Sequence, residues 1–258
     1  MKTIAIFGYG YVAQFLVRKL YQTHNVIIVT RKPESINGVQ TIAFGQPLPF
    51  VDGVISTVPP VDGIDPVLDQ YQFDCWVAYC SSTGVYGDHQ GDWVSEDTLC
   101  RPTNQRGQWR LEIEQQWMAY PNSCILRLAG IYGPDRSAIN QILNSAERID
   151  KPGHLFSRIH VEDIAGFAMF AFYHNLKGIY NLADCLPASS REVIEYACDL
   201  LSKPYPKLVP FDQAVLSPMA AEFYKDSKKV NANKIRHSGY TLRFPDYKVG
   251  LENIKMIK

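Results

Sequence analysis

The chain has 258 residues, in which 26 Lys and Arg balance 26 Asp and Glu, and 46% of the residues are hydrophobic. This length fits one large α/β domain, alone or with a small annex, and the balanced charge argues against a polyanion or an anionic membrane as partner. We expect no signal peptide, because the first predicted strand begins at residue 3, and no apolar run approaches membrane length. Six scattered cysteines without a Cys-x-x-Cys pair fit reduced thiols, so we expect a cytoplasmic protein without a metal site.

The first strand and the turn after it carry the strongest motif. The apolar run 4–7 predicts a strand buried on both faces, and helical spacing of apolar residues follows the turn. Gly8 permits a tight turn and Gly10 lets the backbone approach a pyrophosphate at the helix N-terminus, while Ala13 replaces the third glycine of the dinucleotide fingerprint. The alternative is a strand–helix turn whose glycines serve geometry alone. The predicted dinucleotide contacts in this turn are Gly8, Gly10, Tyr11 and Val12.

The second predicted strand, Asn25 to Thr30, ends at a basic residue. An NAD site would carry an acidic residue here to bind the ribose 2′-hydroxyl, but the chain has Arg31. Because a guanidinium suits a 2′-phosphate, this position favours NADP, with NAD as the alternative. The other interpretation is that Arg31 and Lys32 form a solvated strand end.

A third, weaker strand is predicted near Val39 to Phe44, and a fourth over Val54 to Val58, where two prolines stop the ladder. The carboxyl end of such a strand opens onto the cofactor crevice of this architecture. Thr57, Val58 and Pro59 are therefore predicted to contact the dinucleotide, although each also suits a turn that merely ends a strand.

A fifth strand near Trp76 to Tyr79 leads into Ser-Ser-Thr-Gly-Val-Tyr-Gly-Asp at 81–88. This motif resembles the active-site strand of the extended short-chain dehydrogenases/reductases, which include nucleotide-sugar epimerases and dehydratases. Three later stretches, 126–134, 158–165 and 178–183, resemble further motifs of that family in the same order.

This resemblance implies a Rossmann-type doubly wound parallel sheet with a small, discontinuous C-terminal substrate lobe. Residues 1–133 and about 161–185 would form the NAD(P)-binding core, and about 134–160 and 186–258 the lobe. Ser82 matches the catalytic Ser/Thr that binds the substrate oxygen; alternatively its hydroxyl bonds its own strand-end backbone. The acid/base would then be a noncanonical residue, with Tyr86 and His160 as the candidates, or an ordered water.

The chain departs from the family on the helix that begins near Gln105. The family has Tyr-x-x-x-Lys there, whereas Arg106 and Arg110 stand in the tyrosine and lysine positions. Arginine is not a proton donor at neutral pH, because its pKa lies above about 12. Arg110 can still bind a ribose or phosphate, and Arg106 can bind an anionic substrate or lie on a solvated helix face. The pattern resembles an atypical branch of the family.

The back half supplies the other predicted contacts. By the resemblance, Gly130 is assigned to the cofactor, and Arg106, Tyr132, Arg136 and His160 to the substrate. A histidine whose ring is satisfied by backbone is an equal alternative for His160. We also predict a helix from Glu162 to His174, a capping box at Ser189 opening a helix to about Leu201, and a solvated surface at Lys225 to Lys229.

Two functions remain open at this point. The first is an NADP-dependent oxidoreductase or epimerase, acting as monomer or homodimer on a small carbonyl or nucleotide-sugar-like substrate. The second is a catalytically silent NADP(H)-binding redox sensor or interaction protein, which the missing tyrosine favours. Nucleic-acid binding is poorly supported by the balanced charge.

Overall fold

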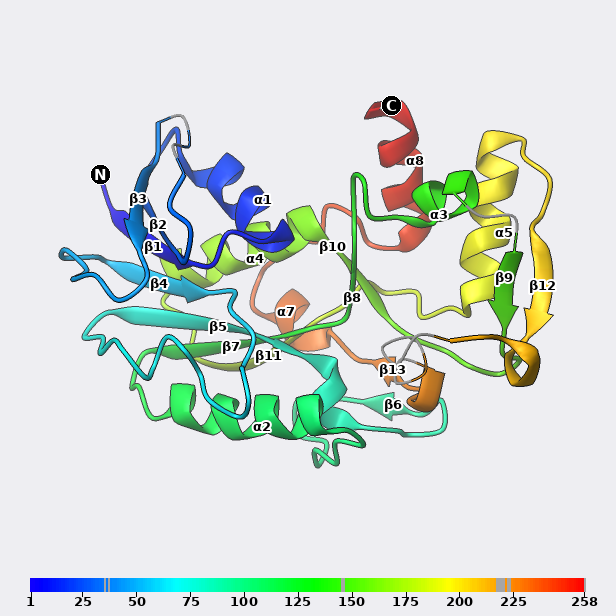
Figure 1. The fold of residues 1–258 in the computed structure, drawn as a ribbon, viewed down its shortest axis with the longest axis horizontal. Coiled ribbons are helices and arrows are strands. Elements are labelled where there is room, and N and C mark those ends of the chain that lie inside the picture. The colour runs from blue at the N-terminus through cyan, green and yellow to red at the C-terminus, as the bar shows by residue number, and fades with distance from the viewer. Residues whose placement is uncertain (35, 37, 145–146, 217–220, 222–223, 258) are drawn as a thin grey trace.

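A seven-stranded parallel sheet in the order β3–β2–β1–β4–β5–β7–β11 forms the centre of the molecule (Figure 1). The structure is a computed structural model that describes residues 1–34, 36, 38–144, 147–216, 221 and 224–257. The strands of this sheet are β1 (Thr3–Phe7), β2 (Asn25–Thr30), β3 (Gln40–Ala43), β4 (Gly53–Ser56), β5 (Trp76–Ser82), β7 (Ser123–Leu128) and β11 (Gly178–Leu182).

Helices cover both faces of this sheet. Helices α1 (Tyr11–Leu20) and α4 (Val161–Tyr173) pack together on one face, and α2 (Gln105–Met118) lies on the other (Figure 1). Strand β1 is buried on both faces from residue 4 to residue 7, as its apolar run predicts. The predicted Rossmann-type doubly wound sheet is therefore confirmed.

A second, smaller group of elements lies at the carboxyl ends of the strands (Figure 1). Its core is formed by α3, α5 and α8, and three small parallel ladders join β8 to β10, β9 to β12, and β6 to β13. The bounds are β6 (Trp93–Val94), β8 (Gly130–Tyr132), α3 (Ala138–Asn144), β9 (Glu147–Asp150), β10 (Arg158–His160), α5 (Ser190–Leu201), β12 (Lys207–Pro210), β13 (Lys229–Val230) and α8 (Tyr247–Ile257). Helix α7 (Asn233–His237) packs instead against β11 of the main sheet. Two short 3₁₀ helices are η1 (Thr83–Tyr86) and η2 (Phe211–Gln213).

Local signals correctly located several of these elements. The Ser189 hydroxyl accepts from the Glu192 backbone N–H at 3.1 Å, and the Glu192 carboxylate accepts from the Ser189 N–H at 2.8 Å. This reciprocal pair is the predicted capping box of α5. The fifth strand runs three residues further than predicted, to Ser82, because β7 continues to pair with it.

The segment from Lys225 to Lys229 differs from its prediction as solvated surface. Lys228 is only 8% exposed, and Val230 and Ile235 beyond it are packed into the core of the sheet. Part of the segment assigned to the lobe therefore returns to the Rossmann core. None of the helices within the described residues is long and apolar enough to cross a membrane. All six cysteines are free thiols.

Candidate functional site

The turn between β1 and α1 is held by close backbone packing. Gly8 has a φ of +85°, and a Cβ there would lie 2.9 Å from the Thr57 hydroxyl oxygen and 3.2 Å from a Val58 methyl. Thr57 is itself fixed, since its hydroxyl and its N–H both donate to the Phe7 carbonyl, at 2.9 and 3.0 Å. A side chain at Gly8 would therefore be excluded both by backbone conformation and by contact.

The N-terminus of α1 is open. Gly10 is its N-cap, no side chain caps the helix there, and a Cβ on Gly10 would meet no heavy atom within 4 Å among the described residues. The backbone N–H groups of the first turn of a helix have no intrahelical partners and favour negative charge. This turn can thus receive an anion such as a pyrophosphate.

Two cavities meet at this turn. The first, which we call the β2-side cavity, measures about 570 Å³ and follows the ends of β1, β2 and β4. The second, the central cavity, measures about 480 Å³ and extends toward η1 and the lobe. Both are lined by Gly10 and Thr57, so they adjoin along the carboxyl edge of the sheet.

Most of the sequence-predicted site residues line these cavities. The predicted residues on the β2-side cavity are Gly8, Gly10, Arg31, Thr57, Val58 and Pro59. Those on the central cavity are Gly10, Tyr11, Val12, Thr57, Ser82, Arg110, Gly130 and Arg136. A third cavity of about 390 Å³ adjoins the central one through Gly130 and Arg136 and carries Tyr132 on its wall.

Ser82 combines the two interpretations that its sequence left open. Its hydroxyl oxygen accepts from the Gly84 backbone N–H at 3.1 Å and so caps η1, and the residue also lines the central cavity. A hydroxyl has one donor and two acceptor lone pairs, so the capping bond leaves it able to bond a ligand oxygen.

Helix α2 is pressed against η1 in a way that aligns Arg110. A Cβ on Gly107 would lie 2.8 Å from Pro102 and 3.1 Å from the Gly84 carbonyl oxygen, so only glycine allows this approach. Arg110 donates from Nη1 to the Cys80 carbonyl at 3.2 Å and faces the central cavity. Arg106, one turn earlier, is exposed and is not among the residues that line the described cavities.

A buried polar network lies beneath the central cavity. The Arg127 guanidinium forms a bidentate pair with the Glu114 carboxylate, the shortest contact being 2.7 Å, and Ser81 donates to the same carboxylate at 2.5 Å. Both charged side chains are almost fully buried. The pairing with Glu114 raises the pKa of Arg127. This network ties α2 to β5 and β7.

Tyr86 belongs to this network and not to the cavity, which corrects its assignment as an acid/base candidate. It is fully buried, its hydroxyl donates to Asn181 at 2.7 Å, and the Arg127 guanidinium lies 4.8 Å from its ring centre. Burial raises the pKa of Tyr86 to about 12. A phenol with this placement lacks access to a ligand.

His160 is likewise a core residue, in contrast to its predicted catalytic and substrate roles. It is fully buried, its Nδ1 accepts from the Glu162 N–H at 3.2 Å, and this bond caps α4. Its ring centre lies 3.9 Å from that of Phe244 and 5.1 Å from that of Tyr132. Burial lowers the pKa of His160 to about 4, so the ring is neutral at pH 7.

Sequence reasoning missed two charged residues on the central cavity, Asp226 and Lys228. A usable signal was present, because Val230 and Ala232 alternate with the polar residues Lys229 and Asn231, and Lys228 is in register with the two apolar residues. In an extended segment a period of two places all three on one face, and the two apolar members indicate that this face is buried.

Comparison with known proteins places this geometry in a class. No family model matches the chain. A solved structure from Methylobacillus flagellatus, described as a candidate NAD-dependent epimerase/dehydratase, is 26% identical and has a TM-score of 0.76. The match covers 99% of this chain and 98% of the Methylobacillus chain. The chain therefore has the fold of the NAD-dependent epimerase/dehydratase-like extended short-chain dehydrogenases/reductases.

A conserved protein of unknown function from Silicibacter pomeroyi is more similar still. It is 38% identical, with a TM-score of 0.89 over 100% of this chain and 99% of that one, so the chain belongs to the same family as this protein. Protein YeeZ of Escherichia coli K12 is 33% identical over 124 residues. That match covers 46% of this chain and spans only 43% of YeeZ.

Two less similar structures share the fold alone. The dTDP-glucose 4,6-dehydratase of Bacillus anthracis, in complex with NAD, is 13% identical with a TM-score of 0.79, over 99% of this chain and 96% of that one. The human epimerase family protein SDR39U1, with NADPH, is 17% identical with a TM-score of 0.77, and the match covers 98% of this chain and 99% of that one.

Proposed function

We propose that this protein binds NADP(H) and acts as an oxidoreductase or epimerase on a small carbonyl or nucleotide-sugar-like substrate. The observation that carries the proposal is the pair of adjoining cavities. They meet at Gly10 and Thr57, where β1 and β4 end, and they extend from Arg31 on one side to Ser82 on the other. Dinucleotides bind across the carboxyl ends of parallel strands in this architecture.

The residues present fit a dinucleotide. The open first turn of α1 suits the pyrophosphate, and the apolar walls of the β2-side cavity, which include Phe44, Val58 and Pro59, suit the adenosine half. Arg110, at the other end, suits the nicotinamide ribose. When bound, the nicotinamide supplies or accepts the hydride, while Ser82 holds the substrate oxygen.

Arg31 supports NADP in preference to NAD. It lies at the carboxyl end of β2 on the wall of the β2-side cavity, where an NAD site would carry an acidic residue. A guanidinium can form paired, charge-assisted hydrogen bonds with a 2′-phosphate.

Calorimetric titration of the protein with NADPH and with NADH tests the proposal directly. We expect a one-to-one complex with NADPH and weaker binding of NADH. If neither cofactor gives a heat of binding and neither changes the melting temperature of the protein, the proposed function is overturned.

Arg106 supports a second candidate function, a binding protein without catalysis. Arg106 stands in the position of the family's tyrosine, but its side chain is exposed and does not line the described cavities. The two functions separate in one assay, because an enzyme oxidises NADPH with ketones, aldehydes or nucleotide-sugar derivatives. A protein that binds NADPH but turns over none of a broad panel fits the second candidate.

A further inference from the structure

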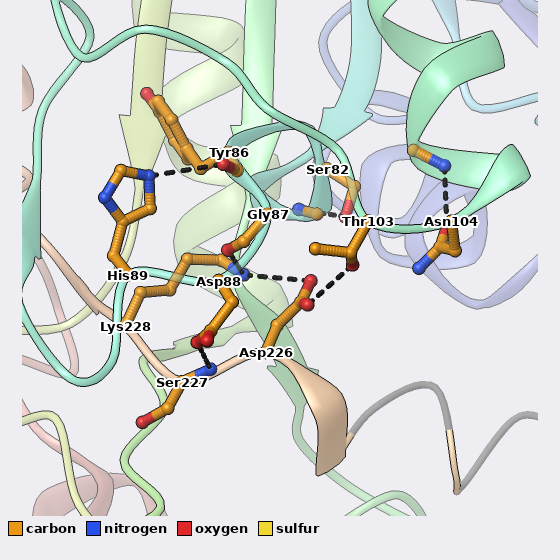
Figure 2. Close-up of polar contacts among 12 residues, drawn as sticks. Ser82, Tyr86, Gly87, Asp88, His89, Thr103, Asn104, Asp226, Ser227 and Lys228 are labelled. Carbon is orange, nitrogen blue, oxygen red and sulfur yellow. Dashed lines mark hydrogen bonds and ion pairs between the residues drawn. The ribbon is translucent and has the colours of Figure 1, made fainter.

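A segment from the C-terminal part of the chain, Asp226 to Val230, crosses the wall of the central cavity; we call it the strap. Thr103 donates to the Asp226 carboxylate at 2.6 Å, and the Ser227 N–H donates to Asp88 at 2.8 Å (Figure 2). On the lobe side, the Val230 N–H donates to the Ser157 hydroxyl at 2.8 Å. The strap is thus fixed to both parts of the molecule.

Lys228 is the buried cation of this strap. Its Nζ donates to the Gly87 carbonyl at 2.8 Å and lies 3.5 Å from the Asp226 carboxylate (Figure 2). An ammonium has three donors, so these two contacts leave one for a ligand. The residue lines the central cavity together with Ser82 and Arg110.

The other titratable side chains on the central cavity are poor proton donors near neutral pH. Burial raises the pKa of Tyr11 and of Cys80 to about 12, and the Tyr11 hydroxyl is already donated to the Pro134 carbonyl at 2.7 Å. Arg110 and Arg136 keep their protons at any ordinary pH. Asp226 is an acceptor when ionised.

We propose that Lys228 supplies the proton that the family's tyrosine would supply, delivered from the strap instead of from α2. In the reducing direction the carbonyl carbon would receive the hydride that bound NADPH supplies, leaving NADP⁺. The carbonyl oxygen takes a proton from the Lys228 ammonium as the C–O double bond becomes single. The products are an alcohol and a neutral amine, which solvent reprotonates, and oxidation runs through the same steps reversed. This inference rests on the proposed function.

The surroundings of Lys228 suit this exchange. Burial lowers the pKa of Lys228, and Asp226 and Asp88 oppose this effect by favouring the charged form. Among the described residues, further titratable groups near the strap include His89, whose Nε2 lies 3.2 Å from the Tyr86 carbonyl oxygen, and His154, whose Nε2 lies 2.9 Å from the Asp226 carbonyl oxygen. The Lys151 ammonium interacts electrostatically with the Asp88 carboxylate. A lysine desolvated in this way can lose and regain a proton nearer neutrality than an exposed one.

The first test measures Lys228 itself, without any substrate. Formaldehyde with cyanoborohydride methylates only neutral amines, so mass spectrometry of the labelled peptide across pH 6 to 11 reports proton release. We expect half-maximal labelling of Lys228 at a lower pH than that of its neighbour Lys229, and slower labelling once NADPH is bound. Equal midpoints, no labelling, or no effect of bound NADPH would each overturn the proposal.

The second test uses carbonyl substrates that the wild type reduces. Lys228→Arg keeps the charge and the bond to Gly87 but cannot release a proton, so kcat should fall at least about 100-fold while the NADPH Kd changes less than about twofold. Lys229→Arg, in the same strap and packed over Trp93, is the matched control and should keep the wild-type rate. Full rescue by arginine would assign Lys228 a structural role only.

The outcomes separate this proposal from the function on which it rests. If calorimetry detects no NADP(H) binding, both fail. If NADPH binds and Lys228 labels like Lys229, only the role of Lys228 fails. If no substrate of the panel is reduced, the labelling result alone decides whether Lys228 can exchange a proton in the cavity.

Discussion

The β2-side cavity and the central cavity are neighbours built in opposite ways. The first is lined mainly by residues at the carboxyl ends of β1 to β4, and all of its lining residues lie within the first 70 residues of the chain. The second combines the ends of β5 and β7 with Phe156 of the lobe and Lys228 of the strap, so its walls come from across the whole sequence. The proposed cofactor half of the site is thus a local product of the Rossmann motif, whereas the proposed substrate half depends on long-range packing.

Breaking the network beneath the central cavity should have the largest effect. Arg127→Met would leave the Glu114 carboxylate buried without its partner, and loss of one member of such a pair costs about 3–5 kcal/mol of unfolding free energy. Urea unfolding of wild type and variant measures this loss. Arg191→Met, which removes an exposed pair with Glu195, is the control and should stay close to the wild type. A similar loss in both variants would contradict the special role of the buried pair.

The β2-side cavity can be tested through its one basic residue. Arg31→Ala should weaken NADPH binding about 10-fold, or about 1.4 kcal/mol, because the 2′-phosphate loses a charge-assisted contact, and NADH binding should change little. Calorimetry with both cofactors gives the ratio. Lys32→Ala, exposed and outside the lining of this cavity, controls for the general loss of positive charge. Equal weakening of both cofactors would reject the assignment to NADP.

A gradual, pH-dependent effect is expected from Asp184, which follows β11 and is buried where the lobe begins. Burial raises its pKa to about 8, so the folded state retains a proton that the unfolded chain releases near pH 4. Stability should therefore fall as pH rises toward 8, by at most about 1.4 kcal/mol per pH unit, and Asp184→Asn should remove this slope.

The comparison is best made between pH 6.5 and 8. Below that window His160, whose pKa is lowered to about 4, contributes the opposite slope, since its neutral folded form loses stability as pH falls from about 6.5. Thermal melts of wild type, Asp184→Asn and the exposed control Asp212→Asn give the slopes. A variant that keeps the wild-type slope would show that Asp184 is ionised in the folded protein.

The features that the sequence predicts well are those formed by neighbouring residues. The glycine turn, the strand ends at Arg31 and Thr57, and the Ser189 capping box each need only a few consecutive positions. Their physics is backbone geometry and local hydrogen bonding, which leave a direct trace in residue type and spacing.

The misplaced residues are those whose surroundings come from distant segments. The ring of His160 is covered by Phe244, and Lys228 is held by Gly87, 141 residues away. A motif match predicted a functional role for His160, and a run of charged residues predicted that Lys228 lies on a solvated surface. Both predictions were wrong because neither local pattern contains the distant residues that bury these side chains. Tertiary packing, and not local propensity, determined both outcomes.

The pairing of β6 with β13 also gives the protein an intrinsic optical reporter. Trp93 is 55% exposed, and the Lys229 ammonium lies 5.4 Å from its ring centre. Trp109 is half-buried, and Trp76 and Trp117 are buried. The fluorescence of Trp93 should be open to collisional quenching by iodide, and its emission should respond to any displacement of the strap. Binding of a candidate substrate beside Lys228 can therefore be measured by the fluorescence of Trp93, without an added label and before any reaction is known.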